Sequence, residues 1–409
     1  MQPWLWGART TFRARPGEPM YLDPEDEEIL AGEKGETRQR MMELLVALGK
    51  VFGAERLVGI KSAQVSGASY KTIGEYGLAW LSSLDARAVV PAVLNPIGMP
   101  RGRWKEMGIG PEFAANQEAV IAAYERLGVK LECTCTPYYL HKTSFGDHLA
   151  WSESSAVSYA NSVIGARTNR EGGPGALAAA LVGKTPCYGL HLEKNRKPHL
   201  IIEVTSDEKD WSIARYGALG YHAGKLVGNK IPYFRGITPD SDQLKALGAA
   251  MAATGAVALY HVDNVTPEAK NTGYDLSGLE VVSVEPAEID RLFTRIPVDA
   301  VAIGCPHCSP AELHDIAGLL EGKTVIRPLY VFAAHGVIDK NQKTVSSIER
   351  SGARVFADTC MVVSPVMERY PAIMVNSGKA LAYVPDMCGA IARIGSIEEC
   401  VEVATSQSS

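Results

Sequence analysis

The stretch VDAVAIGCPHCSP (residues 298–310) combines a mostly apolar run, two cysteines three positions apart and a Ser-Pro pair that can open a helix. A short apolar run followed by a small or polar turn and a helix is typical of a strand in an α/β sheet. Ligands of such sheets bind beyond the carboxyl ends of the strands. The placement of Cys305 and Cys308 therefore raises the question of what two thiols do there.

The same pattern recurs on both sides of this stretch. Apolar runs at 256–260, 324–332 and 354–357 alternate with helix-like segments, and helical spacing of apolar residues marks 36–52 and 111–127. The chain is therefore predicted to be α/β, with largely parallel sheets. In the first half of the chain, Asn95 and Cys135 also come just past apolar runs.

Composition limits the possible functions. The 409 residues are 46% hydrophobic and 21% charged, as in ordinary globular proteins, and the net charge of −5 argues against a nucleic-acid partner. No apolar run is long enough for a transmembrane helix, and residues 1–19 lack the apolar centre of a secretory signal. We expect a cytoplasmic protein without a membrane partner, with an N-terminal arm over 1–19.

The eight cysteines are too few for a disulfide scaffold, so we expect reduced thiols. For Cys305 and Cys308 the residues alone leave four interpretations open: a zinc site, a redox pair, two inert core thiols, or one ligand of an iron–sulfur cluster. A cluster needs distant partners, and Cys135 and Cys360 are the best placed because both lie in turn-like stretches. Three thiolates around four irons would leave one iron open to a substrate.

Several longer motifs resemble the aconitase X family, from about residue 20 to near residue 400. They are SAQVSGASYKTIGE (62–75), LNPIGMP (94–100), CTCTPY (133–138), WSESSAVSYANSVIGARTNREGGP (151–174), YGLHLE (188–193), GCPH (304–307), DTC (358–360) and SGKALAYVP (377–385). The resemblance implies a multi-layer, aconitase-like catalytic body over 20–409. We expect two or three α/β subdomains, with boundaries near 150 and 240.

The resemblance also implies a set of site residues. A 4Fe-4S cluster with one open iron is expected on Cys135, Cys305 and Cys360. The substrate-binding positions implied are Gly67, Ala68, Ser69, Asn95, Pro96, Glu153, Ser154 and Lys379. This chain has Gly67-Ala68-Ser69 where the family more often has Gly-Val-Ser. No residue of the chain is an obvious base for the alpha proton, and the resemblance suggests a serine on a separate small subunit.

Family members are dehydratases, and some carry a small swivelling domain in the same chain whereas others have it as a small subunit. A chain of 409 residues leaves no room for that domain, so we expect the large subunit of the split type. The implied reaction converts (R)-5-phosphomevalonate, a small phosphorylated hydroxy acid, to trans-anhydromevalonate 5-phosphate. Two alternatives stay open. One is dehydration of another hydroxy acid such as cis-3-hydroxy-L-proline, and the other is a non-catalytic zinc or redox protein that uses Cys305 and Cys308.

Overall fold

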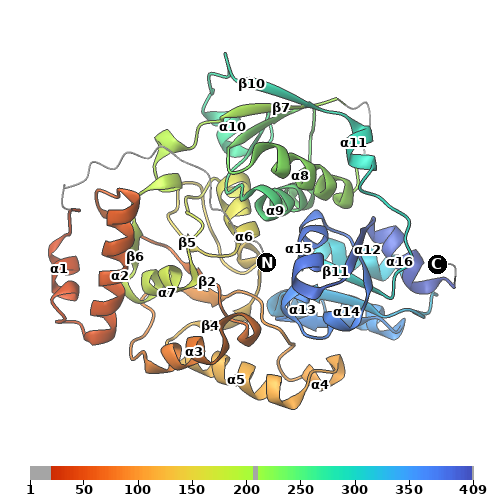
Figure 1. Cartoon of the computed structure of the whole chain (residues 1–409), viewed down its shortest axis with the longest axis horizontal. Helices are drawn as coiled ribbons and strands as arrows, with labels where there is room; N and C mark the ends of the chain where they lie inside the picture. The colour runs from red at the N-terminus through yellow and green to blue at the C-terminus, as the bar shows by residue number, and fades with distance from the viewer. Residues whose placement is uncertain (1–19, 206–210, 408–409) are drawn as a thin grey trace.

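The computed structural model describes residues 20–205 and 211–407. These residues form three α/β bodies, each built on its own parallel sheet (Figure 1). The red-to-yellow N-terminal body, the green middle body and the blue C-terminal body meet near the centre of the molecule. The N-terminal arm expected over 1–19 lies outside the described residues.

The N-terminal body is built on a four-stranded sheet of order β4-β3-β2-β5, in which all pairs are parallel. The strands are β2 (Ala63–Val65), β3 (Ala92–Leu94), β4 (Lys130–Cys133) and β5 (Ala150–Trp151). The main helices are α1 (Pro24–Leu30), α2 (Glu36–Phe52), α3 (Tyr70–Ser83), α4 (Trp104–Met107), α5 (Pro111–Arg126), α6 (Ser154–Tyr159) and α7 (Gly173–Val182). A small antiparallel pair, β1 (Leu57–Gly59) and β6 (Lys184–Pro186), flanks this sheet.

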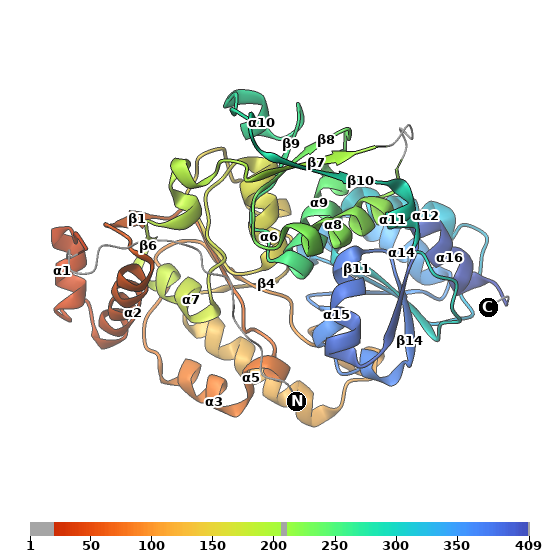
Figure 2. The ribbon, with the colours of Figure 1, turned by 45° about the horizontal axis from the view of Figure 1, so that its top comes forward.

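The middle body has a second parallel sheet, of order β10-β7-β8-β9. Its strands are β7 (Leu200–Val204), β8 (Pro232–Arg235), β9 (His261–Val262) and β10 (Glu280–Val284). The long helices α8 (Ile213–Val227) and α9 (Ser241–Gly255) lie between this sheet and the C-terminal body (Figure 2). The short helices α10 (Pro267–Asn271) and α11 (Pro286–Asp290) complete it.

The C-terminal body has a five-stranded parallel sheet of order β13-β12-β11-β14-β15. Its strands are β11 (Ala300–Cys308), β12 (Leu329–Ala333), β13 (Arg354–Ala357), β14 (Ala372–Val375) and β15 (Ile391–Ile394). Its helices are α12 (Pro310–Leu319), α13 (His335–Lys340), α14 (Gln342–Arg350), α15 (Gly378–Cys388) and α16 (Ile397–Thr405). Strand order reverses at β11 and β14, which is the kind of switch point where open α/β sheets bind ligands.

Both faces of this last sheet are buried, and alternate residues of β11 serve different cores. Val301 and Ile303 pack with apolar residues of α12, α14 and α16 in one cluster. Ala302 packs on the other face, in a cluster that includes α15 and much of the N-terminal body. The sheet therefore joins the C-terminal body to the N-terminal one through a continuous apolar core.

The bodies also touch through backbone. Ile97, just past β3, lies opposite Thr359, just past β13, in a parallel bridge. Its N–H donates to the Asp358 carbonyl at 2.8 Å, and its carbonyl accepts from the Cys360 N–H at 2.9 Å. Helices α8 and α15 approach so closely that a Cβ atom at Gly378 would lie 2.0 Å from the carbonyl oxygen of Gly217. Only glycine fits at that crossing, and this contact fixes the start of α15.

The predicted α/β architecture with largely parallel sheets is confirmed. The run at 256–260 is not a strand: Ala256 adopts a left-handed φ of 58° at the end of α9, and β9 begins only at His261. Tyr260 donates its backbone N–H to the Ser162 hydroxyl instead of to a neighbouring strand. None of the described helices combines the length and the apolar character needed to span a bilayer.

Candidate active site

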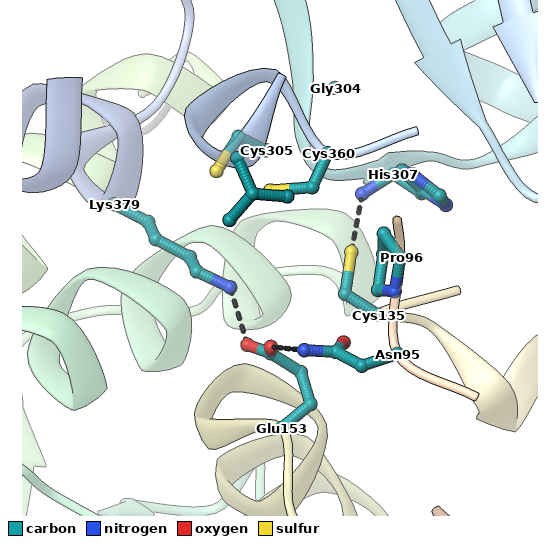
Figure 3. Close-up of a pocket in the computed structure, with 10 residues that line it drawn as sticks. Asn95, Pro96, Cys135, Glu153, Gly304, Cys305, His307, Cys360 and Lys379 are labelled. Carbon is teal, nitrogen blue, oxygen red and sulfur yellow. Dashed lines mark hydrogen bonds and ion pairs between the residues drawn. The ribbon is translucent and has the colours of Figure 1, made fainter. Parts of the chain in front are cut away.

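Three cysteines from three separate segments of the chain line one cavity of about 50 Å³ where the N-terminal and C-terminal bodies meet (Figure 3). Cys135 follows β4, Cys305 lies near the carboxyl end of β11 and Cys360 follows β13. The three segments meet because the carboxyl ends of their parallel strands face the same space. The described chain has no disulfide at these positions, since all three thiols are free.

His307 ties the three cysteine segments together. Its backbone N–H donates to the Cys135 Sγ at 3.1 Å. Its ring Nε2 lies 2.9 Å from the carbonyl oxygen of Thr359, and its Nδ1 lies 3.1 Å from the hydroxyl of Thr134. A carbonyl can only accept, so Nε2 carries the proton and Nδ1 accepts from Thr134. Burial lowers the pKa of His307 to about 4, so the ring is neutral at physiological pH.

A buried ion pair forms the opposite wall. Lys379, in the first turn of α15, pairs with Glu153, which precedes α6 (Figure 3). Burial opposes ionisation of Glu153, but attraction to Lys379 and hydrogen bonds from Lys379, Ser155 and Asn95 outweigh it and lower the pKa of Glu153 to about 2. Burial also disfavours the Lys379 ammonium, but Glu153 raises its pKa well above the usual value. The wall therefore carries a full ammonium and a full carboxylate.

Asn95 extends this wall toward the cysteines. Its Nδ2 donates to Glu153 Oε2 at 3.0 Å. Its Oδ1 is buried and has no hydrogen-bond partner within the part of the chain that the structure describes. A buried polar atom without a partner is costly, so an acceptor facing this cavity favours a ligand that donates to it.

The cysteines themselves fit a metal cluster better than they fit a purely protein environment. Burial raises the pKa of the Cys135 thiol to about 12 and that of Cys305 well above the ordinary value, although Lys379 acts in the opposite direction on both. Without a strong cation these thiols stay protonated and apolar, whereas iron binding deprotonates them.

Within the described ranges, no group of three or more His, Cys, Asp or Glu side chains is arranged to hold a metal ion. In a multi-iron cluster each cysteine binds a different iron, which places the thiolates further apart than the ligands of one ion. A shared cavity lined by three thiols from separate segments suits that wider spacing.

Of the site residues expected from the sequence, seven line this cavity: Asn95, Pro96, Cys135, Glu153, Cys305, Cys360 and Lys379. Four expected substrate positions, Gly67, Ala68, Ser69 and Ser154, do not line it. Ser154 adjoins Glu153, and its hydroxyl lies 3.4 Å from Glu153 Oε1.

Residues 67–69 form the turn between β2 and α3, beside the end of β3. The backbone N–H of Asn95 donates to the Val65 carbonyl at 2.9 Å, which places this turn next to the Asn95 loop. Gly67 has a left-handed φ of 82°, and Ser69 precedes the first turn of α3 with its buried hydroxyl unpartnered among the described residues. The turn thus offers an unpartnered hydroxyl at the N-terminus of α3, whereas the backbone N–H of Tyr70 is already bound by Gln117.

The two thiols of the CPHC stretch have different surroundings. Cys305 lines the cavity and belongs to the core shared with the N-terminal body. Cys308 is fully buried with the apolar residues under α12, α14 and α16. The sequence analysis missed His307 as a site residue, and its only signal was its position between the two cysteines. It also missed Gly304 and Val363, which line the cavity.

A second buried ionic group, outside the cavity, contacts the segments that follow Cys135 and Cys305. Lys245 of α9 forms ion pairs with Glu312 and Asp242. The side chain of Lys245 is 2% exposed and that of Glu312 is 3% exposed. Asp242 accepts hydrogen bonds from Ser309 and from Tyr139, the latter at 3.1 Å. The group therefore joins the chain after Cys305 and the chain after Cys135 to the middle body.

Models of the first, second and third domains of aconitase X match residues 19–194, 198–294 and 298–406. The phosphomevalonate dehydratase large subunit of Methanosarcina mazei is 53% identical over 94% of this chain and 97% of its own length. That of Methanothermobacter thermautotrophicus is 50% identical over 90% and 95%.

More distant relatives and a solved structure match the same region. The cis-3-hydroxy-L-proline dehydratase of Hypocrea jecorina is 32% identical, over 95% of this chain but 69% of its own length. The crystal structure of the holo-form of Thermococcus kodakaraensis aconitase X matches with a TM-score of 0.87 and 44% identity, and covers 94% of this chain and 100% of that one.

Proposed function

The chain belongs to the aconitase X family, and we propose on that premise that it is the large subunit of a phosphomevalonate dehydratase. This hydro-lyase removes water from (R)-5-phosphomevalonate to give trans-anhydromevalonate 5-phosphate, a step of a modified mevalonate pathway that leads to isoprenoids. Four archaeal relatives at 44–53% identity, each matched over at least 90% of this chain, have this name. The proposal includes a cytoplasmic setting.

We assign an iron–sulfur cluster to Cys135, Cys305 and Cys360, with the 4Fe-4S form and one open iron as the expected state. The observation that carries this assignment is the convergence of three thiols from three segments on one cavity, opposite a buried lysine–glutamate pair. When bound, such a cluster supplies a Lewis acid for the hydroxyl and carboxylate of a hydroxy acid. The N–H of His307 that donates to Cys135 stabilises negative charge on that sulfur.

The other residues of the wall bind and orient the substrate. The Lys379 ammonium attracts an anionic group into the cavity, and Glu153 keeps that ammonium fixed and charged. The unpartnered Oδ1 of Asn95 accepts from a substrate hydroxyl. The Gly67–Ser69 turn, at the N-terminus of α3, receives a further anionic group of the substrate through the Ser69 hydroxyl.

The base that removes the alpha proton is assigned to a partner. Glu153 has a pKa of about 2 and is committed to Lys379, and the ring Nδ1 of His307 accepts from Thr134, so neither is a free base. We propose that a small subunit with the swivelling domain covers the cavity and supplies this base. The isolated large subunit is then expected to be inactive.

The test is co-expression of the chain with its small partner, anaerobic reconstitution and counting of iron and sulfide. Dehydration is then assayed with (R)-5-phosphomevalonate and with cis-3-hydroxy-L-proline, with each subunit alone as the control. Turnover of phosphomevalonate by the complex only is the expected result. Turnover of cis-3-hydroxy-L-proline but not of phosphomevalonate would mean that hydroxyproline is the substrate. A colourless, zinc-containing complex without activity would overturn the proposal.

A further inference from the structure

A second cavity, of about 390 Å³, lies at the opposite edge of the C-terminal sheet from the cysteines. Its wall contains the end of α4, the chain that enters β12, the start of β13 and the chain that enters β14. These segments are at the amino ends of their strands, whereas Cys305 and Cys360 are at carboxyl ends. The two cavities have no lining residue in common.

Three guanidinium groups face this second cavity. They belong to Arg327, Arg354 and Arg369, and no acidic residue lines the cavity with them. Each one is held by a backbone carbonyl: Arg354 donates to Glu106 O at 3.1 Å, Arg369 donates to Gly108 O at 2.7 Å, and Arg327 donates to Val403 O. A guanidinium has five N–H donors, so each keeps donors for a ligand.

Arg327 is half-buried, whereas Arg354 and Arg369 are exposed, and the three lack the ion pairs that some other arginines form. Arg101, Arg103 and Arg196 each pair with a carboxylate at 2.6–2.9 Å. Over 20–205 and 211–407, none of the three cavity arginines has a carboxylate within 4.0 Å. The carboxylate of Glu106 is bound by Arg103 at 2.7 Å. The hydrogen bond from Arg103 lowers the pKa of Glu106 and the charge of Arg354 adds to this, but that carboxylate pairs with Arg103 and does not line the cavity. Three positive charges therefore gather at a cavity whose lining contains no acid.

A glycine and two tyrosines shape the cavity beside the arginines. Gly108 has a φ of 85°, and a Cβ atom there would lie 3.0 Å from Arg369 Nη1, so glycine makes room for this guanidinium. The hydroxyls of Tyr330 and Tyr370 are hydrogen-bonded to each other at 2.8 Å and add a donor to the wall. Burial raises the pKa of Tyr330, whereas the positive charges of Arg354 and Arg369 act to lower it. Both guanidinium groups are therefore close enough to the Tyr330 phenol to interact with it electrostatically.

We infer that this cavity binds a small phosphate-bearing anion at a site separate from the cysteine cavity. Guanidinium groups match phosphate oxygens with paired N–H donors, and three of them with a tyrosine hydroxyl suit a dianionic oxyanion. The volume is within the range of small-molecule sites. The inference stands independently of the proposed function, because no cysteine-cavity residue takes part in it.

The experiment is calorimetric titration of the full chain, assembled with its cofactor and partner, with two probes at pH 8. Inorganic phosphate and glycerol 3-phosphate distinguish a free phosphate ion from an organic phosphomonoester as the ligand. We expect one site per chain for at least one probe, and binding about tenfold weaker or more for each arginine replaced in R369Q and in R354Q/R369Q. R369K, which retains the charge but not the paired donors, is expected to lose less than R369Q.

Two further variants locate the site. R126Q removes an arginine that also donates to backbone carbonyls, at the far end of the 16-residue helix α5, and is expected to leave binding unchanged. K379Q removes the cation of the cysteine cavity and is also expected to leave it unchanged. Absence of binding by both probes at millimolar concentration overturns the inference, and so does binding that K379Q abolishes and R354Q/R369Q leaves intact.

Discussion

Glu171 provides a sharp test of the packing in the N-terminal body. This glutamate precedes α7, is 6% exposed and has the Thr185 hydroxyl, at 3.2 Å, as its side-chain partner. Burial raises the pKa of Glu171 to about 7, since one hydrogen bond does not replace the lost hydration. The substitution Glu171→Gln keeps the shape and the acceptor for Thr185 but removes the ionisable group.

The sign of the effect follows from proton linkage. In the unfolded chain this carboxyl titrates near 4.5, so between 4.5 and about 7 the folded state holds a proton that the unfolded state has lost. The proton on Glu171 therefore contributes its full stabilisation of the folded state below pH 4.5, and this stabilisation is lost as the pH rises through about 7. At about 1.36 kcal/mol per pH unit, the penalty relative to a neutral group is about 1 kcal/mol at pH 5.5 and about 3 kcal/mol at pH 8.

The assay is urea denaturation of wild type and Glu171→Gln at pH 5.5 and pH 8, followed by circular dichroism. The variant is expected to gain about 2 kcal/mol more at pH 8 than at pH 5.5, because its side chain no longer has to ionise in the core. The matched control is Glu118→Gln on the exposed side of α5, which is expected to show no such difference. Equal gains at the two pH values would refute the reasoning, and a larger gain at pH 5.5 would reverse its sign.

Four other substitutions probe the candidate site and the buried ionic group behind it. Cys305→Ala is expected to remove the broad visible absorption and the iron, whereas Cys308→Ala retains both; equal losses on metal analysis would favour a paired metal knuckle. His307→Gln is expected to lower the iron content and the thermal stability of the loaded chain, since the ties to Thr134 and Thr359 are lost; unchanged iron retention would deny it a positioning role. Lys245→Met leaves Glu312 and Asp242 buried without their cation and is expected to reduce the free energy of unfolding by about 3–5 kcal/mol, measured by urea denaturation; a loss below about 1 kcal/mol would mean that the group is hydrated.

The secondary structure was predictable where its causes are local. The Ser-Pro pair after Cys308 opens α12, because the Ser309 hydroxyl accepts from the N–H of Glu312 and the Glu312 carboxylate accepts from the N–H of Ser309. Residues 300–303 of the apolar run 298–303 form the first part of β11 for an equally local reason, their strand propensity. The run at 256–260 shows the limit, since the backbone N–H of Tyr260 donates to the Ser162 hydroxyl, 98 positions away, instead of to a neighbouring strand.

The candidate site was predictable in part. The resemblance selected Cys135, Cys305 and Cys360, which now line one cavity, but the residues alone left Cys305 and Cys308 equivalent. What separates the two thiols is which core each one faces, and that depends on which helices cover each side of β11. The role of His307 was hidden for a similar reason, because its hydrogen-bond partners are 173 and 52 positions away.

The sequence by itself determined the alternation of strands and helices, since caps, turns and apolar spacing act over a few residues. Only the tertiary structure decided that the ends of β4, β11 and β13 share one space and that three arginines gather at the opposite edge of the sheet. Both arrangements depend on how parallel strands from distant segments are ordered and packed. That order is fixed by burial of both faces of each sheet, which no short stretch of the chain encodes.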